Sequence, residues 1–491
     1  MSRRLAALLA TALLAGCASL TAPTAPPSTG AEVASCTTWF QRLDGVIDAH
    51  QVRDVEADRI AGFNGLRVDR LAASLRDRAQ ADPAAFDAWL GRLRTLEAEG
   101  RMVEIANLPA RAFPIDQARN AAEALDQTRR CIEAWREPLQ HDDALRQALL
   151  ARADVPDRYA TWKRVVGLYA LVRWPFHAGV QGWEREHRAL IAQWAASPLP
   201  TQRYVAAGPP LSSAHMERLW RNRPRDALGL PLFSANEAHL LLAANAPALE
   251  IETRGEFDRI GPLIWRDAAV PRVDTGVPVV YQRLATTRYR GQLLLQLVYS
   301  LWFPERPARG RLDLLAGALD AVVLRITLAP DDGRPLIVDT IHGCGCYQQF
   351  IPTAELRLRD GAPRNVEWAF SAIELPALHS GQRIVVRLNS ASHYVVGSAP
   401  DSGAAGITYT LCDEQELRSL PLPQGGTRSV FDADGLVAGS ERAERLLFWP
   451  MGIESAGAMR QWGHHATAFV GRRHFDDADL IERRFTIPGL E

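Results

Sequence analysis

The side chains best suited to chemistry lie in the segment Ile341-His342-Gly343-Cys344-Gly345-Cys346-Tyr347. Thiolate and imidazole are zinc ligands, and copper(I) also accepts thiolate. On a regular strand His342 and Cys346 would stand about 13 Å apart, too far to share one metal ion. The two glycines tolerate positive φ and therefore favour a tight turn in which the cysteines converge. The segment is a candidate metal or redox site.

Other interpretations of the two thiols remain open. Cys344 and Cys346 could form a small, strained and easily reduced disulfide ring. Either could bridge to Cys412, which ends a predicted strand, and Cys346–Cys412 is then a candidate structural disulfide. Cys344 could also act as a nucleophile with a nearby histidine as its base. The spacing differs from the Cys-x-x-Cys pairs of strong zinc signatures.

More imidazoles in the C-terminal half could complete such a site. His393 lies in a Ser-rich turn, and His464 and His465 precede a predicted strand. Neighbouring residues of a strand point to opposite faces, so only one of that pair is expected in any one site. With zinc or copper as the possible metal, the candidate set is His342, Cys344, Cys346, His393, His464 and His465.

The elements that must position these residues have the period of β-strands. Residues 322–328 alternate apolar and polar side chains, Asp331-Asp332-Gly333 supplies a turn, and residues 335–341 form a second apolar run. This pattern predicts a β-hairpin that leads into His342. Further strands are expected at 293–303, 366–373, 383–388, 408–412 and 466–470. Residues 245–491 should therefore form a mainly antiparallel β-rich domain.

Residues 32–200 have a helical period instead. Cys36, Phe40, Leu43 and Ile47 recur at spacings of three and four, and Cys131 borders a second such stripe. We expect a disulfide between Cys36 and Cys131, with two packed free thiols as the alternative. The whole chain is then α+β: a helical domain (32–200), a proline-rich connecting region (201–244) and the β-rich domain.

A third helical stripe contains several of the chain's thirteen tryptophans. Trp162, Val165 and Val166 share a face with Tyr169 and Val172, and Pro175 should end or kink this helix. The aromatic and basic run Arg173–His177 would suit a membrane interface or a sugar surface. Because Trp162 fits an apolar stripe, we expect these tryptophans to pack in the core.

Composition sets the class of protein more than its activity. The 491 residues carry a formal net charge of −1, without the basic excess of a nucleic-acid binder. No apolar run of 18 residues occurs beyond the N-terminal segment, so no membrane-spanning helix is expected there.

The N-terminus resembles that of bacterial lipoproteins. Arg3 and Arg4 precede an apolar stretch that ends in Leu14-Ala15-Gly16-Cys17, which is similar to a lipobox. The resemblance implies a signal peptide (1–16), acyl chains such as palmitate on Cys17, and a Pro-, Ser- and Thr-rich tether (17–31). Because Ala18 follows the cysteine rather than Asp, it also implies the outer membrane, facing the periplasm. Five cysteines then remain, an odd number in an oxidising compartment.

Recognisable catalytic motifs are missing from the sequence. We find no Gly-x-Ser-x-Gly, His-Glu-x-x-His, Walker loop or Cys-x-x-Cys-His. We therefore expect a lipid-anchored envelope protein that binds a ligand, or an envelope protein or cell-wall partner, and no nucleic acid. The alternative is an envelope enzyme that uses a metal or thiol site at His342, Cys344 and Cys346.

Overall fold

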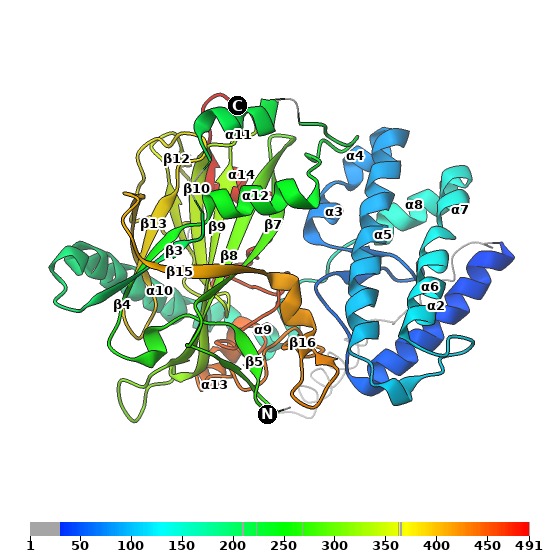
Figure 1. The fold of residues 1–491 in the computed structure, drawn as a ribbon, viewed down its shortest axis with the longest axis horizontal. Coiled ribbons are helices and arrows are strands. Elements are labelled where there is room, and N and C mark those ends of the chain that lie inside the picture. Colours follow the sequence, from blue (N-terminus) through cyan, green and yellow to red (C-terminus); the bar gives the residue numbers. More distant parts are fainter. Residues whose placement is uncertain are drawn as a thin grey trace, which may run out of the picture.

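The computed structural model describes residues 30–208, 211–221, 223–267, 269–361, 363 and 366–490. A helical N-terminal part lies beside a curved β-sheet (Figure 1), which confirms the predicted α+β class. The predicted signal peptide, Cys17 and the tether up to residue 29 lie outside the described residues. Within the described ranges, no helix is both long and apolar enough to cross a membrane.

The N-terminal part is a helical layer around its own apolar core. Its longest helix begins where the Asp82 carboxylate accepts hydrogen bonds from the N–H groups of Ala84 and Ala85, with Pro83 in the first turn. The helices are α2 (Ala31–His50), α3 (Arg70–Ser74), α4 (Arg76–Ala81), α5 (Pro83–Ala106), α6 (Ala121–Glu133), α7 (Arg136–His141) and α8 (Asp143–Arg152), with a small ribbon of β1 (Asp58–Arg59) and β2 (Arg67–Val68).

The first helix is tied covalently to α6. Cys36, Phe40, Leu43 and Ile47 are all buried, as the stripe predicts. Cys36 and Cys131 form a disulfide, which confirms that prediction. The bond closes a chain segment that contains most of this helical part.

One ten-stranded sheet dominates the rest of the chain. Its strand order is β11-β10-β9-β8-β7-β15-β3-β4-β13-β14. Six of its nine neighbouring pairs are antiparallel, so the sheet is mainly antiparallel but mixed. The strands are β3 (Thr201–Ala206), β4 (Ala248–Glu252), β7 (Val279–Tyr289), β8 (Gln292–Arg306), β9 (Gly317–Leu328), β10 (Pro335–His342), β11 (Gln349–Pro352), β13 (Ile384–Leu388), β14 (Val395–Pro400) and β15 (Ile407–Asp413).

The central hairpin has the predicted position and register. β9 and β10 are antiparallel with Leu324 opposite Thr340, and the turn residue Gly333 has φ of +75°. Three other expected strands are confirmed: 293–303 corresponds to β8, 383–388 to β13 and 408–412 to β15. The strand expected at 366–373 is wrong, because this segment is not a strand. The sheet also takes β3 from the segment that we expected only to connect the two halves.

The expected strand at 466–470 is wrong, and the reason is visible in its hydrogen bonds. The Glu367 carboxylate accepts hydrogen bonds from the N–H groups of Phe469 and Val470. The Tyr159 hydroxyl bonds to both the N–H and the carbonyl of Ala468. Side chains thus satisfy the backbone groups that a neighbouring strand would otherwise pair, and only an isolated bridge from Ala466 to His474 remains.

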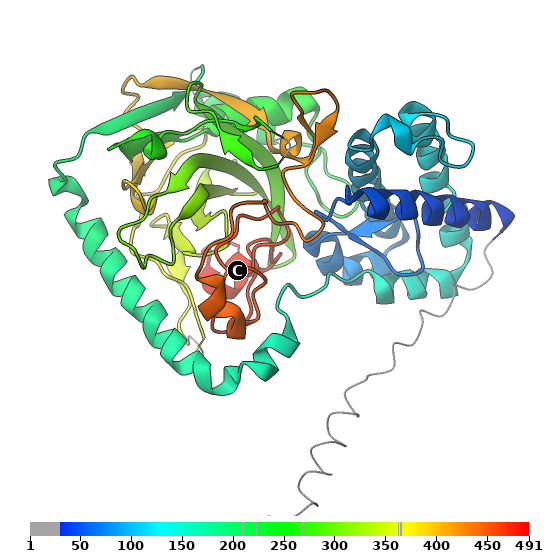
Figure 2. The same ribbon diagram turned by 90° about the horizontal axis from the view of Figure 1, so that it is seen from below.

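The sheet curls into a nearly closed barrel (Figure 2), and its remaining helices lie around it. α11 (Ser213–Arg221) and α12 (Ala235–Asn245) cover one end, where Met216 and Leu241 join the largest core cluster. α10 (Tyr169–Gln193) runs along the outside of the barrel. The smaller elements are α9 (Thr161–Val166), α13 (Arg445–Phe448), α14 (Leu480–Arg484), η1 (Ala110–Ala112), η2 (Trp194–Ala196), η3 (Glu256–Asp258), η4 (Glu414–Arg418), η5 (Trp449–Met451), β5 (Leu263–Trp265), β6 (Pro271–Val273), β12 (Arg357–Leu358), β16 (Leu420–Pro421), β17 (Thr427–Arg428) and β18 (Phe485–Thr486).

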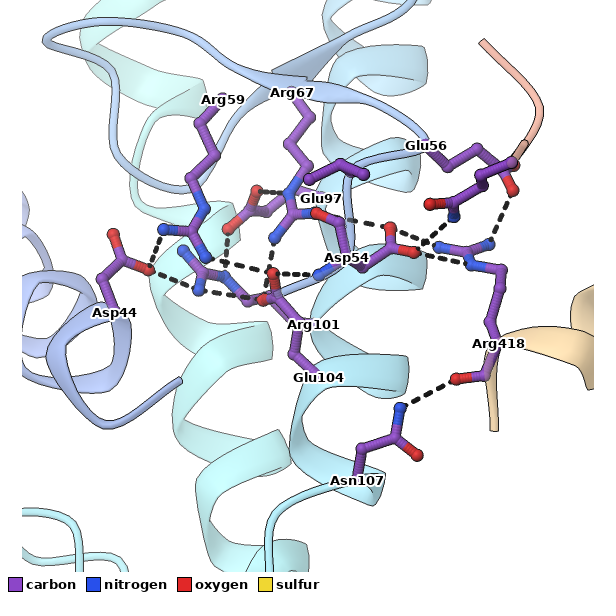
Figure 3. A network of polar contacts seen from close by, with 12 residues as sticks. Asp44, Asp54, Glu56, Arg59, Arg67, Glu97, Arg101, Glu104, Asn107 and Arg418 are labelled. Carbon is purple, nitrogen blue, oxygen red and sulfur yellow. Dashed lines mark hydrogen bonds and ion pairs between the residues drawn. The ribbon is translucent and has the colours of Figure 1, made fainter. Parts of the chain in front are cut away.

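A buried network of ion pairs joins the helical part to the sheet (Figure 3). Arg67 is fully buried and pairs with Glu97 and Glu104 of α5, each at 2.8 Å. Asp54 connects the network to η4, which follows strand β15, because its carboxylate accepts two hydrogen bonds from Arg418. Buried ion pairs therefore join the two halves of the chain, in addition to apolar contacts.

Candidate functional site

The segment from His342 to Cys346 forms the tight turn that its glycines predict. The His342 N–H donates to the Cys346 carbonyl at 3.0 Å, and the Gly345 N–H donates to the His342 carbonyl at 2.7 Å. Gly345 has φ of +88°, and a Cβ there would lie 2.7 Å from the Ala466 carbonyl oxygen. A Cβ on Gly343 would lie 2.7 Å from that of Ala321. Both glycines are required because the turn is pressed between β9 and residue 466.

The two thiols of this turn lie together but are not oxidised. Cys344 and Cys346 are both buried and free, and the Cys346 N–H donates to the Cys344 sulfur at 3.4 Å. A hydrogen bond to Cys344, together with burial, holds the pKa of the Cys346 thiol well above its usual value. Cys346 is therefore a protonated thiol at neutral pH, which does not favour a nucleophilic role for it. Its hydrogen bond to Cys344 instead lowers the pKa of the Cys344 thiol, although burial opposes that shift.

The candidate disulfide between Cys346 and Cys412 is absent, so that prediction is wrong. Cys412 is also a free, half-buried thiol. It lies on β15, and three strands, β7, β8 and β9, separate β15 from the strand that leads into the Cys346 turn. The linear sequence does not reveal this separation.

His342 and His393, two of the predicted site residues, do come together, on the carboxylate of Asp320. Nδ1 of His393 lies 2.8 Å from one oxygen of Asp320, and Nδ1 of His342 lies 3.6 Å from the other. Burial raises the pKa of Asp320, but Arg442 and the two imidazoles outweigh it and hold the pKa well below its usual value. Asp320 is thus a buried anion that fixes both rings.

His464 and His465 have other environments. Nε2 of His464 donates to the Val55 carbonyl at 2.7 Å, which anchors this loop to the helical part. Burial lowers the pKa of each imidazole to about 3, helped by Arg158 for His464 and by Arg460 for His465. Across the described ranges, no three His, Cys, Asp or Glu side chains form a group that could hold a metal ion. The geometry therefore gives zinc or copper no ligand set at this turn.

A cavity of about 690 Å³ lies beside the turn, where the two edge strands of the sheet face each other. We call the gap between these two edge strands the seam. His187 of α10 bridges it: its Nε2–H donates to the Val395 carbonyl of β14 at 3.0 Å and to Oε1 of Gln349 in β11 at 3.2 Å. α10 thus covers the gap that the open sheet leaves (Figure 2). Eight aromatic rings line the cavity: Phe176, Trp183, Tyr347, Trp368, Phe370, Tyr394, Phe448 and Phe469.

Arg306 and Glu444 are the least paired of the buried charges in the cavity wall. Arg306 is 5% exposed; its Nη2 donates to the Tyr394 hydroxyl at 3.1 Å, and its guanidinium lies over the Tyr347 and Tyr394 rings. Glu444 is 3% exposed, and its carboxylate accepts no hydrogen bond from any described residue. Burial raises the pKa of Glu444 to about 7, despite the opposing effect of Arg442 and Arg306.

Several polar atoms in the wall also lack partners. The indole N–H groups of Trp183 and Trp368, Nδ1 of His187 and Oε1 of Gln348 are buried without a hydrogen-bond partner among the described residues. Buried polar atoms normally find partners, so such a group of unsatisfied atoms around one cavity needs an explanation. Polar groups of a bound molecule would satisfy them.

Sequence reasoning identified the turn but missed most of this cavity. Of the predicted site residues, only Cys346 lines it, while His342 contacts the rings of Tyr347 and Tyr394 from behind. Arg306 and Glu444 carried no motif. The available signal was the concentration of tryptophans before residue 200, which includes Trp183.

Comparisons with protein-family models, curated proteins and solved structures find no match to this chain.

Proposed function

We propose that this protein binds a small organic ligand in the cavity beneath α10. The cavity itself carries the proposal, because its volume of about 690 Å³ and a wall that combines many aromatic rings with polar side chains are typical of small-molecule sites. A purely structural gap would be expected to fill with side chains, since protein interiors pack closely.

The wall favours a ligand with a flat or apolar body and a polar head. The centroid of the Trp183 ring lies 5.2 Å from that of Phe370 and 5.9 Å from that of Tyr394, and these rings offer an aromatic surface. Arg306 supplies donors for an anionic or hydroxyl group, and Glu444 can donate or accept according to its protonation. Such a head would also meet the unpartnered indole N–H groups.

The proposed setting is the cell envelope. The lipobox-like segment supports lipid attachment at Cys17 and a location at the outer membrane, facing the periplasm. There, the ligand would be a component of the membrane or of the cell wall.

The binding proposal can be tested with a matched pair of glycine variants on α10. Gly179 lines the cavity, and a Cβ there meets open space. Gly182 lies one turn further along the same helix, where a Cβ approaches only the Arg185 guanidinium at 3.9 Å. With the dye 8-anilinonaphthalene-1-sulfonate as probe, calorimetry should show a one-to-one saturable component for the native chain. We expect Gly179→Trp to lose it and Gly182→Trp to keep it; equal binding by both variants would contradict the proposal.

A second candidate function is an enzyme that uses acid–base chemistry in the same cavity. The observation that favours it is Glu444, whose pKa of about 7 suits proton transfer near neutral pH. The thiol form of this hypothesis has less support, because Cys344 is buried and does not line the cavity, and His342 is engaged with Asp320. Turnover of ester or glycoside substrates that disappears in Glu444→Gln, with a pH limb near 7, would favour the enzyme.

A further inference from the structure

An exposed apolar surface lies next to the cavity mouth. Nine large apolar side chains, each 37–71% exposed, occur in two segments and form what we call the apolar rim: Trp162, Val165, Val166, Leu168, Leu171, Trp174, Leu446, Leu447 and Trp449. Single exposed apolar residues are common on soluble proteins, but a contiguous group usually marks an interaction surface.

The two segments of the apolar rim are neighbours in space. A Cβ on Gly167, between α9 and α10, would lie 2.6 Å from the Cβ of Pro450. The rings of Phe176 and Phe448 pack with their centroids 5.4 Å apart. Phe176 and Phe448 also line the cavity, so the apolar rim and the cavity mouth are two sides of the same elements.

Helix α9 buries a charged side chain and exposes apolar ones, the reverse of the usual arrangement at a protein surface in water. Its buried residue is Arg164, whose Nε donates to the Met451 carbonyl at 2.7 Å and whose Nη2 donates to the Gly471 carbonyl at 2.8 Å. Trp162, Val165 and Val166 point outward, at 63–68% exposure. In proteins surrounded by water, the arginine would usually be exposed and the apolar residues buried, since arginine is rarely buried and apolar residues line cores. The expectation that Trp162 packs in the core is therefore wrong.

The chemistry of the apolar rim fits the surface of a lipid bilayer. Its tryptophans carry both a ring and an N–H group, which favours the headgroup region. Basic side chains border it: Arg445 is exposed, the Arg173 guanidinium lies over the Trp174 ring, and Lys163, which pairs with Glu454, lies over the Trp162 ring. Basic groups beside apolar ones are typical of segments that lie in the interface of anionic membranes. A protein partner would not require this combination.

The preceding chain can reach the same membrane. Gly30, the first described residue, follows Cys17 by thirteen residues, a length that spans at most about 45 Å when fully extended. If Cys17 carries lipid, as proposed above, the tether holds Gly30 within that distance of the bilayer.

We propose that the apolar rim inserts into the interfacial layer of a phospholipid bilayer and turns the cavity mouth toward the membrane. Docking depends only on the exposed side chains of α9, α10, α13 and η5, so it does not require that the cavity bind a ligand. Loss of dye binding in the glycine variants and loss of docking are separate results.

The test places a fluorophore at single positions of the full chain. Among the described residues, Cys412 is the one free thiol that is not buried, and Cys412→Ser removes it. Val166→Cys is then labelled with an environment-sensitive nitrobenzoxadiazole dye. Leu358→Cys is the matched control: it is also exposed, at 44%, and lies on β12 at the opposite end of the sheet from α9 and α13 (Figure 1). Vesicles of phosphatidylglycerol and phosphatidylethanolamine, with or without brominated acyl chains, are then added.

We expect the dye at position 166 to brighten several-fold, shift to the blue and be quenched by the brominated lipid, while the dye at 358 stays water-like. A dye at 166 that stays water-like on vesicle-bound protein would overturn the proposal. So would a blue shift without vesicles: if it grows with protein concentration, a second copy covers the apolar rim, and if it does not, a segment of the same chain covers it. Unchanged thermal unfolding of both labelled chains shows that the fold is intact.

Discussion

Glu444 shows how one buried carboxyl can set the response of the cavity to pH. Its pKa rises from an ordinary 4.5 to about 7, because burial penalises the charged form more than Arg442 and Arg306 favour it. Between these pH values the folded protein holds a proton that the unfolded chain has released. The free energy of unfolding contributed by this group therefore falls as pH rises from about 4.5 to about 7.

Glu444→Gln should abolish that loss. We compare the free energy of unfolding of the variant with that of the native chain at each pH. This difference should be up to about 3 kcal/mol more in favour of the variant at pH 8 than at pH 4.5, at about 1.4 kcal/mol per pKa unit. Urea unfolding at both pH values measures the difference. Glu186→Gln, an exposed position on α10, serves as the control and should show no such dependence. An equal effect of Glu444→Gln at both pH values would contradict the raised pKa.

At this scale the sequence revealed the turn but not its role. Two glycines between His342 and Cys346 correctly predicted a tight turn, because glycine tolerates the backbone angles that such a turn needs. Motif reasoning then favoured metal or redox chemistry there. Arg306 and Glu444 could not be found in this way, since their importance comes from burial and from side chains distant in the sequence.

Among the elements, α2 and α6 depend on their covalent link. The disulfide joins residues 95 positions apart, and a long closed loop restricts the unfolded chain strongly. The pair Cys36→Ala and Cys131→Ala should lower the free energy of unfolding by about 2–5 kcal/mol. Cys412→Ala, which removes a free thiol, should cost less than about 1 kcal/mol by the same urea titration. Equal costs would show that the disulfide adds little.

The ion-pair network of α5 should be equally sensitive to loss of one member (Figure 3). Arg67→Met removes one of the two arginines that pair with both Glu97 and Glu104, the other being Arg101, and we expect a loss of about 3–5 kcal/mol. Arg76→Met is the matched control, because Arg76 is about one-third exposed and lies 3.9 Å from the exposed Asp154. Its loss should stay below about 1 kcal/mol. Thermal or urea unfolding compares the two, and similar values would argue against a structural role for the network.

Helical periodicity was reliable in one respect and misleading in another. It correctly grouped Cys36, Phe40, Leu43 and Ile47 on one face of α2, and that face is buried. It also grouped Trp162, Val165 and Val166, but their face is exposed. A periodic pattern shows which residues share a face. Which face meets water depends on what packs against the helix, and α9 buries its arginine instead.

For the whole molecule, α10 is the element that completes the barrel. His187 is its one buried residue among those described, and it bonds to both edge strands of the sheet. His187→Ala should loosen the helix and speed tryptic cleavage within residues 169–193 several-fold, while circular dichroism stays unchanged. His177→Ala, about three turns earlier and bonded to Gln181 on the same helix, is the control. Equal cleavage rates in both variants would show that the seam does not depend on His187.

The overall class followed from the change of period along the chain, but the strand order did not. Hairpins such as β9–β10 are local and were predicted correctly. β15 instead lies between β7 and β3, with parallel neighbours far away in sequence. Local patterns contain no information about such pairings, and the seam, the cavity and the isolation of Cys412 all follow from them.

The position of β15 also has a consequence for how the chain reaches its folded state. Until residues 407–413 are available, the hairpins of β7 to β11 and the group of β3, β4, β13 and β14 are two separate sheets with open edges. Pairing over such sequence distances is slow, and open edges recruit other chains. A chain made or exported from its N-terminus therefore stays unable to close its barrel until more than four-fifths of it has emerged. Until β15 arrives, the edges of both sheets stay open to pairing with other chains.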